Sequence, residues 1–98
     1  MATFQKEIPF DLTTALRGIP DWKLNGAKKL EREFTFRSFP EAFSFLTRIA
    51  FEAEHLNHHP DFSSSYRRVR IELFTHDSGT VTEKDLEFAR RIDAINWT

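Results

Sequence analysis

The sequence predicts an α+β fold, in which a four-stranded antiparallel sheet has three helices packed on one face. Two observations support this prediction. Apolar residues recur at helical spacing in three segments and alternate with polar residues in others. The order along the chain is helix, strand, strand, helix, strand, helix, with a short extra strand expected around 62–64. Such a sheet, covered on one face, would bury the apolar stripe of every segment.

Length and composition favour one packed domain. The chain has 98 residues, the size of one ordinary domain, so residues 1–98 are expected to form a single domain. Hydrophobic residues make up 40% of the chain, and eleven Phe provide a large apolar area to bury. The formal net charge is -1 and basic residues are balanced by acidic ones along the chain, so no large basic field and no direct nucleic-acid binding are expected.

The composition also bears on where the protein works. There is no Cys, which excludes disulfides and thiolate chemistry and suits a reducing compartment, so a cytoplasmic location is expected. Met1 to Pro20 lacks the apolar core of a signal peptide, and nowhere do about 18 apolar residues run together. Neither secretion nor membrane insertion is expected.

The first expected element is a short helix within Thr3 to Ile19. Asp11 or Thr13 can cap it, and it stops at Gly18, with Pro20 beyond.

A β-hairpin is expected next, with strands at 21–24 and 28–36. Asn25-Gly26 lies between them and is a dipeptide that tight primed turns prefer. One face of the second strand carries Leu30, Arg32, Phe34 and Phe36, and the other carries Glu31, Glu33 and Thr35. The first of these faces is expected to lie on the core.

The central helix has the clearest signals. Ser38 to Glu41 fits a capping box with Pro40 in the first turn, and apolar residues continue at helical spacing to Leu56. The helix should end near His58 or His59, because the residue before Pro60 is disfavoured in the α region.

The apolar surface of this helix is wider than one sheet face should cover. One stripe consists of Phe39, Phe43, Leu46, Ala50 and Ala53, and a neighbouring stripe consists of Ala42, Phe45, Ile49 and Leu56. A second buried contact is therefore expected, most simply with another copy of the chain.

The last segments complete the sheet and add a helix. A polar connection at 61–65 leads to the longest expected strand, Tyr66 to Thr75, which alternates apolar and polar residues. A turn follows at 77–79. Thr82 then caps a final helix that uses Leu86, Ala89 and Ile92.

Three of the four histidines, together with a carboxylate, form the candidate catalytic group. His58 and His59 follow the central helix, His76 follows a strand, and Asp85 comes nine residues later. An imidazole can give and take protons near neutrality. Because the chain has no Cys, no Gly-rich phosphate loop and no Ser nucleophile elbow, proton transfer is the chemistry best served.

The spacing of these residues resembles a family signature. Glu54-x3-His58-His59-Pro60-x5-Tyr66-x9-His76-x8-Asp85 is similar to that of the pterin-4a-carbinolamine dehydratases, also known as dimerisation cofactors of a homeodomain transcription factor. Trp22, 34–36 and 39–53 also resemble that family. The resemblance implies a homodimer or homotetramer, assembled through strands and the central helix. It further implies loss of water from 4a-hydroxytetrahydropterin to give quinonoid dihydropterin.

The resemblance also implies roles for individual residues. It makes His58, His59 and His76 the catalytic histidines and Asp85 their supporting carboxylate. The substrate-binding residues it implies are Glu54, Trp22, Thr75 and Pro60. It implies no metal and no cofactor. The chain departs from the common family pattern at Phe62, Arg67 and Phe74, which leaves substrate preference less defined than the proton chemistry.

Simpler interpretations stay open for several of these residues. Thr82-x-x-Asp85 fits a capping box, and imidazoles at a helix C-terminus suit the macrodipole. Glu54 can pair with Arg48 or Lys84 on the surface, and Trp22 can be a sheet aromatic.

Two other functions are also open. His55 and His59, at i and i+4, could bind zinc together with His76. In a function of a different class, the chain would be a non-catalytic protein-binding or dimerisation cofactor that docks a partner on the apolar helix.

Overall fold

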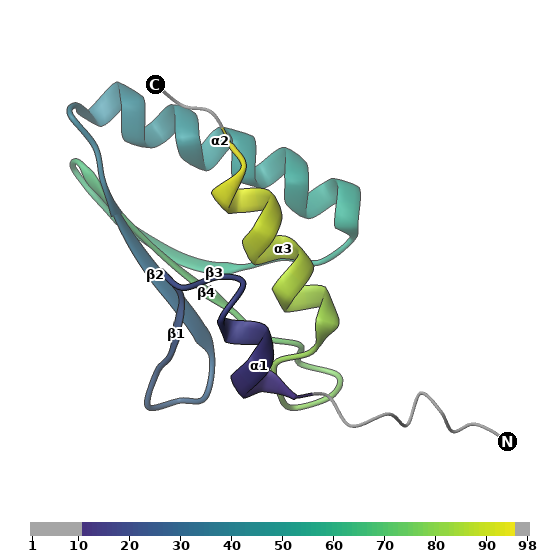
Figure 1. The fold of residues 1–98 in the computed structure, drawn as a ribbon. Coiled ribbons are helices and arrows are strands. Elements are labelled where there is room, and N and C mark those ends of the chain that lie inside the picture. Colours follow the sequence, from purple (N-terminus) through teal and green to yellow (C-terminus); the bar gives the residue numbers. More distant parts are fainter. Residues whose placement is uncertain (1–10, 96–98) are drawn as a thin grey trace, which may run out of the picture.

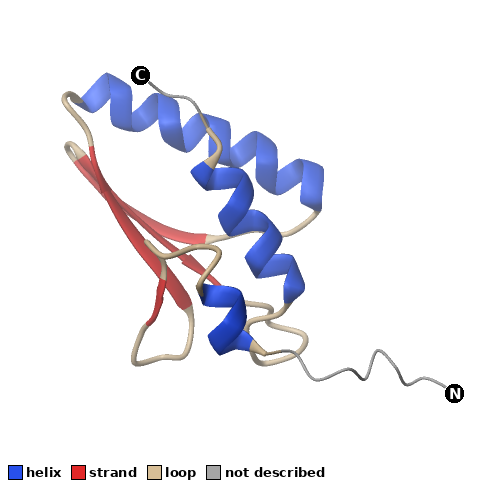
Figure 2. Cartoon of the chain, in the orientation of Figure 1, coloured by secondary structure: helices blue, strands red, loops and turns tan. Residues whose placement is uncertain are grey.

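The computed structural model describes residues 11–95. Its four strands form one antiparallel sheet in the order β1-β2-β4-β3. The strands are β1 (Lys23–Leu24), β2 (Leu30–Thr35), β3 (Asp61–Ser65) and β4 (Arg68–Leu73). The helices α1 (Leu12–Leu16), α2 (Phe39–Leu56) and α3 (Glu83–Asp93) lie on one side of the sheet (Figures 1 and 2). The predicted α+β fold is confirmed.

The short first helix begins at Asp11, one of the two caps that the sequence allowed. The Asp11 carboxylate accepts hydrogen bonds from the Thr14 backbone N–H (3.3 Å) and hydroxyl (2.6 Å). These bonds hold the pKa of Asp11 below its usual range. Residues 3–10 of the expected segment lie outside the described residues.

The β1–β2 hairpin is confirmed, but its predicted primed turn is wrong. The turn is closed by the Lys28 backbone N–H, which donates to the Asn25 carbonyl over 2.9 Å. The positive φ, 63°, is at Lys28, and Gly26 does not need one. The cause is the Asn25 side chain, whose Oδ1 accepts from the backbone N–H groups of Ala27 (2.9 Å) and Lys29 (3.1 Å).

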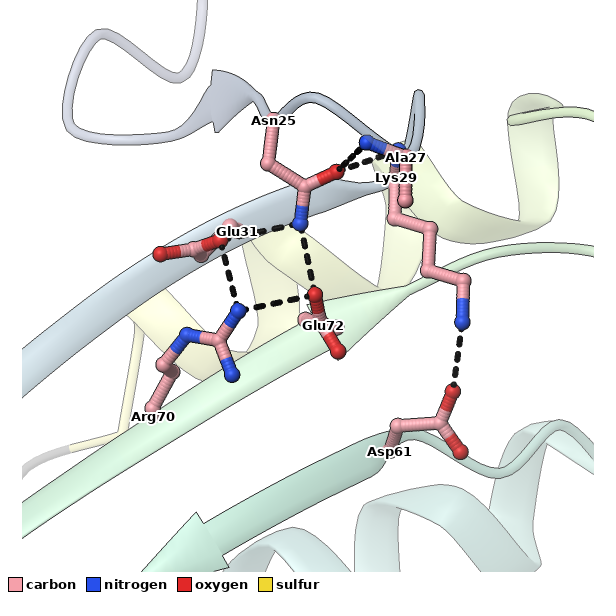
Figure 3. Close-up of polar contacts among 7 residues, drawn as sticks. All are labelled: Asn25, Ala27, Lys29, Glu31, Asp61, Arg70 and Glu72. Carbon is pink, nitrogen blue, oxygen red and sulfur yellow. Dashed lines mark hydrogen bonds and ion pairs between the residues drawn. The ribbon is translucent and has the colours of Figure 1, made fainter.

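A polar network covers the sheet face that carries no helix (Figure 3). Asn25 Nδ2 donates to Glu31 (2.9 Å) and Glu72 (2.6 Å), so one side chain links the turn to two strands. Arg70 donates to the same two carboxylates over 3.1 and 3.0 Å. The Arg70 and Asn25 hydrogen bonds hold the pKa of Glu31 below its usual range.

The opposite sheet face forms the core with the helices. Its fully buried members include Leu30, Ile71 and Leu73 from the sheet, and Phe45, Phe88 and Ile92 from the helices. Arg32 shares this face, as its parity predicted. Its guanidinium lies 4.3 Å from the Phe34 ring centre, and it donates to Asp93 over 2.6 Å.

Only half of the predicted capping box forms at the start of α2. Ser38 Oγ accepts from the Glu41 N–H (3.2 Å), but the Glu41 carboxylate accepts from the Arg37 N–H (2.7 Å) instead of turning back to Ser38. Arg37 also donates to Glu41 through its side chain, which holds the pKa of Glu41 below its usual range.

The central helix ends slightly earlier than predicted. Asn57 caps it in the left-handed conformation (φ 52°), so both following histidines lie in the loop before β3. The expected extra strand is real and spans Asp61–Ser65. The expected long strand is shorter, because Tyr66 has a φ of 56° and turns the chain between β3 and β4.

The outer side of α2 is rich in exposed phenylalanine. The exposed fractions are 48% for Phe39, 59% for Phe43 and 69% for Phe51. The neighbouring stripe is buried under the sheet, with Ala42, Phe45 and Ile49 nearly inaccessible. Part of the wide apolar surface that the sequence predicted for this helix therefore stays uncovered in a single chain. In residues 11–95, no helix is long and apolar enough to cross a bilayer.

Candidate active site

A pocket of about 300 Å³ lies where the loop after α2, the turn after β4 and the start of α3 meet. Its lining residues are Asn57, His58, His59, Thr75, His76, Asp77 and Lys84. The three predicted histidines thus surround one cavity, although His76 is separated from the other two by the strands β3 and β4. The antiparallel pairing of these strands returns the chain to the end of α2.

His58 is the most firmly held of the three. Its Nε2 lies 2.6 Å from Asp85 Oδ1, and the Asp85 side chain is fully buried. Since Asp85 engages Nε2, the ring nitrogen Nδ1 is the one left without a hydrogen-bond partner in residues 11–95. The carboxylate fixes the orientation of the ring.

Asp85 is itself held by the start of α3. Its second oxygen accepts from the Thr75 hydroxyl (2.7 Å) and from the Thr82 backbone N–H (2.8 Å). The two threonine hydroxyls are also hydrogen-bonded to each other over 2.7 Å. The capping interpretation of Asp85 is confirmed, and the same carboxylate contacts His58, so the two interpretations are compatible.

The other two histidines are more exposed. His59 Nε2 lies 2.8 Å from Glu54, and both side chains are largely accessible to solvent. Glu54 therefore pairs with His59 and not with Arg48 or Lys84. The His76 ring packs edge-on against Phe74, with 5.4 Å between the ring centres, and makes no hydrogen bond within the described part of the chain.

The structure does not bring every predicted site residue to this pocket. Trp22 is 3% exposed, packs edge-on against Phe34 and donates to Asp93 over 2.8 Å. It therefore belongs to the sheet core, in agreement with the sheet-aromatic interpretation.

A second pocket adjoins the first, and His59 lines both. It measures about 270 Å³ and is mostly apolar, with Glu54 and Pro60 also in its wall. The remaining lining residues are Leu46, Ile49, Ala50, Ala53 and Phe62. Among the predicted site residues, Thr75 lines the histidine pocket, whereas Glu54 and Pro60 line this apolar neighbour.

Sequence reasoning missed three residues that line the histidine pocket, namely Asn57, Asp77 and Lys84. The only available signal was adjacency, since each stands next to a predicted site residue. Asn57 precedes His58, Asp77 follows His76, and Lys84 precedes Asp85.

The zinc hypothesis needed His55, His59 and His76 to converge. His55 does not line the pocket that contains the other two. The left-handed cap at Asn57 ends α2 before His59, so the i, i+4 geometry of a helical ligand pair is lost. Over residues 11–95, no group of three or more His, Cys, Asp or Glu side chains is arranged to hold a metal ion.

The fold and the pocket define a small α+β protein in which three histidines and a buried carboxylate gather around one cavity. The model of the family described as pterin 4 alpha carbinolamine dehydratase matches residues 6–95, so the chain belongs to that family.

Relatives with assigned names agree with the family match. A protein of Bradyrhizobium sp. (strain ORS 278) is 49% identical over 83 residues, which cover 84% of this chain and 83% of the relative. A protein of Opitutus terrae is 55% identical over 69 residues, or 69% of this chain and 71% of the relative. Both are named, provisionally, pterin-4-alpha-carbinolamine dehydratase.

Two solved structures share the fold. One is described as a transcriptional coactivator/pterin dehydratase from Brucella melitensis, with a TM-score of 0.81 and 35% identity over 96% of this chain and 97% of that one. The other is a pterin dehydratase-like protein identified as a RuBisCO assembly factor in the alpha-carboxysome. Its TM-score is 0.65, with 28% identity over 76% of this chain and 87% of that one.

Proposed function

We propose that the protein dehydrates 4a-hydroxytetrahydropterin to quinonoid dihydropterin, in the recycling of a tetrahydrobiopterin-type cofactor. It would then be a hydro-lyase. Membership of the family and the names of its relatives support dehydratase activity. The observation that carries the proposal is the convergence of His58, His59 and His76 on one pocket.

The reaction needs two proton transfers and no redox partner. The bond between C4a and the hydroxyl oxygen breaks, the N5–H bond gives up its proton, and a C4a=N5 double bond forms as water leaves. Hydroxide is a poor leaving group, so an acid must protonate it while a base accepts the N5 proton. Imidazoles can fill both roles near neutral pH.

In this proposal His58 or His59 protonates the departing hydroxyl, and His76 accepts the N5 proton. Asp85 supports His58 by fixing its tautomer through the 2.6 Å contact at Nε2. Glu54 orients His59 in the same manner over 2.8 Å. Acid and base would thus come from segments that the protein holds around one cavity.

The substrate-binding residues enter the proposal in different ways. Thr75 lines the pocket and bonds Asp85, so it would both contact substrate and hold the carboxylate. Pro60 and Glu54 line the apolar neighbour, which would receive the substituent that projects from the pterin ring. Trp22 would act only through the sheet core on which the site rests.

The direct test is the dehydration of synthetic 4a-carbinolamine, followed spectrophotometrically. The wild-type protein is expected to accelerate loss of the carbinolamine well above the uncatalysed rate. A rate equal to the uncatalysed one, with correctly folded protein, would overturn the proposal.

A second candidate function is a non-catalytic role as a protein-binding or dimerisation cofactor. Two observations favour it. Three phenylalanines on α2 are exposed, and one structural relative is identified as an assembly factor. Under this alternative the pure protein would form stable complexes with a partner chain and would not dehydrate the carbinolamine.

A further inference from the structure

Two charged side chains of the histidine pocket have no part in the proton chemistry. Asp77 comes from the turn after β4, and Lys84 comes from the first turn of α3. Both are exposed, and neither side chain makes a hydrogen bond or an ion pair with any part of the chain that the structure describes. They also do not pair with each other, so both charges are available to a ligand.

The segments that carry these two residues are fixed to one another. The turn is closed by the Gly79 N–H, which donates to the Thr75 carbonyl over 2.9 Å. The Thr75 hydroxyl then bonds both Thr82 and Asp85 at the start of α3, each over 2.7 Å. The backbone frame around Asp77 and Lys84 is therefore set before any ligand arrives.

The electrostatics at the start of α3 do not favour a lysine at position 84. The N-terminal end of a helix carries a partial positive charge, so a cation in the first turn is unfavourable. The flanking residues Glu83 and Asp85 have the charge that this end prefers. Lys84 adds a like charge there and gains no ion pair within residues 11–95, so its ammonium group is free to meet a ligand in the pocket that it lines.

We infer that Asp77 and Lys84 orient the pyrimidine ring of the pterin substrate, an inference that rests on the proposed function. A pterin carries an N3–H and a 2-amino group side by side, and a carboxylate can accept from both. It also carries a carbonyl oxygen on C4, which accepts from an ammonium group. Asp77 supplies the acceptor and Lys84 the donor.

The contact between the Lys84 ammonium and the C4 oxygen would also position the reacting carbon. C4 is bonded to C4a, the carbon that loses its hydroxyl, so an ammonium that binds the C4 oxygen fixes the reacting carbon within the same pocket as the histidines. Positioning of this kind converts binding into rate because the acid and base meet a substrate already oriented. Asp77 and Lys84 act as positioning residues, and the histidines exchange the protons.

Steady-state dehydration kinetics test the inference. Lys84→Met and Asp77→Asn should each raise KM about tenfold, the size expected for loss of one charge-assisted hydrogen bond. Lys84→Arg keeps the positive charge, so its KM should stay close to the wild-type value. Lys23→Met is the matched control, because Lys23 is exposed on β1, outside the pocket, and should leave KM unchanged.

Binding of two unreactive ligands adds a measurement that a purely structural role would not change. Pterin has the 2-amino group, and lumazine has a carbonyl oxygen in its place. The wild-type protein should bind pterin more tightly, because the lumazine oxygen would face the Asp77 carboxylate. Asp77→Asn should remove most of this preference.

The outcomes separate this inference from the proposed function. If the wild type dehydrates the carbinolamine but both variants behave like Lys23→Met, the inference fails and the proposed function stands. If Asp77→Asn weakens pterin and lumazine equally, the orienting role is also wrong. A wild type that does not dehydrate the carbinolamine would overturn both. Raised KM together with lost ligand preference would support the inference.

Discussion

Asp85 shows how one buried side chain can serve the fold and the site together. One of its oxygens caps α3, and the other holds His58. The sequence predicted both roles, because Thr82-x-x-Asp85 is a capping pattern and the histidine spacing matches a family signature. What the sequence could not provide was the direction of the Asp85 side chain, since that depends on how β4 and α3 meet.

Asp85→Ala should lower the free energy of unfolding by about 1–3 kcal/mol, because it removes the cap and leaves buried hydrogen-bonding groups unpaired. Urea unfolding would measure the loss. Glu83→Ala is the control, since Glu83 lies in the same helical turn but is exposed. Equal stability of the two variants would contradict the described network.

The position of some side chains could not be predicted from the sequence, as is seen for Lys84, Asp77 and Trp22. No periodicity or motif singles out Lys84 or Asp77, and only their adjacency to site residues could have done so. Trp22 was assigned to the pocket by family resemblance, but the register of β1 on β2 places it in the core against Phe34. Register is decided by long-range pairing, which one sequence does not reveal.

The pH dependence of stability can be assigned to Glu31. Its pKa is lowered by Arg70 and Asn25 from the usual 4.5, so its stabilising contribution is fully present above that value and is lost as pH falls through the lower folded pKa. On acidification below 4.5, wild-type stability should therefore fall more steeply than that of Glu31→Gln.

Unfolding titrations at several pH values would measure this difference. Above about pH 6 the carboxylate is ionised in both the folded and the unfolded chain, so the difference between the two proteins should be constant there. Parallel acid profiles for the two proteins would contradict the assignment.

At the scale of elements, helices and strands follow from sequence periodicity, but turns follow from side-chain contacts. The hairpin was predicted from Asn25-Gly26, yet the turn geometry depends on the Asn25 side chain, whose Oδ1 accepts from the backbone N–H groups of Ala27 and Lys29. The Nδ2 of the same side chain donates to Glu31 and Glu72 on two different strands, and a local dipeptide rule considers none of these contacts. The early end of α2 has a different origin, because it follows from the left-handed backbone conformation of Asn57.

The observed turn and the primed turn that the sequence predicted lead to opposite expectations for Gly26→Ala. In the observed turn a Cβ at Gly26 meets nothing within 4 Å and no positive φ is needed, so stability should be unchanged or slightly raised. Asn25→Ala should lower stability by about 1–3 kcal/mol, because two backbone N–H groups lose their acceptor and two carboxylates each lose one of their hydrogen-bond donors.

Thermal unfolding of the two variants beside the wild type would distinguish the geometries. A large loss of stability in Gly26→Ala, with Asn25→Ala near wild type, would show that the primed turn is correct after all.

At the scale of the whole molecule, the sequence predicted an apolar surface that one chain does not cover. Residues 11–95 bury one stripe of α2 and leave Phe39, Phe43 and Phe51 exposed. Exposed patches of this kind are typical of interaction surfaces. We expect a second copy of the chain to cover this side of α2 in a homodimer or homotetramer, which stays a prediction.

Light scattering on the purified protein should therefore give a mass of two or four times 11.6 kDa. Phe43→Glu should shift the mass toward one subunit, because a carboxylate cannot be buried unpaired in an apolar interface. Ala27→Glu, at an exposed position of the turn between β1 and β2, is the matched control and should not change the mass. A single-subunit mass for the wild type would contradict the expectation.

The most direct test of the central claim is the value of kcat/KM for carbinolamine dehydration in His59→Ala compared with His55→Ala. Both substitutions remove an exposed imidazole near the end of α2, but only His59 lines the pocket. Acid–base catalysis predicts a fall of about 10² to 10⁴-fold for His59→Ala and a near wild-type value for His55→Ala. Equal values for the two variants would contradict a part for His59 in the proton transfers of this pocket.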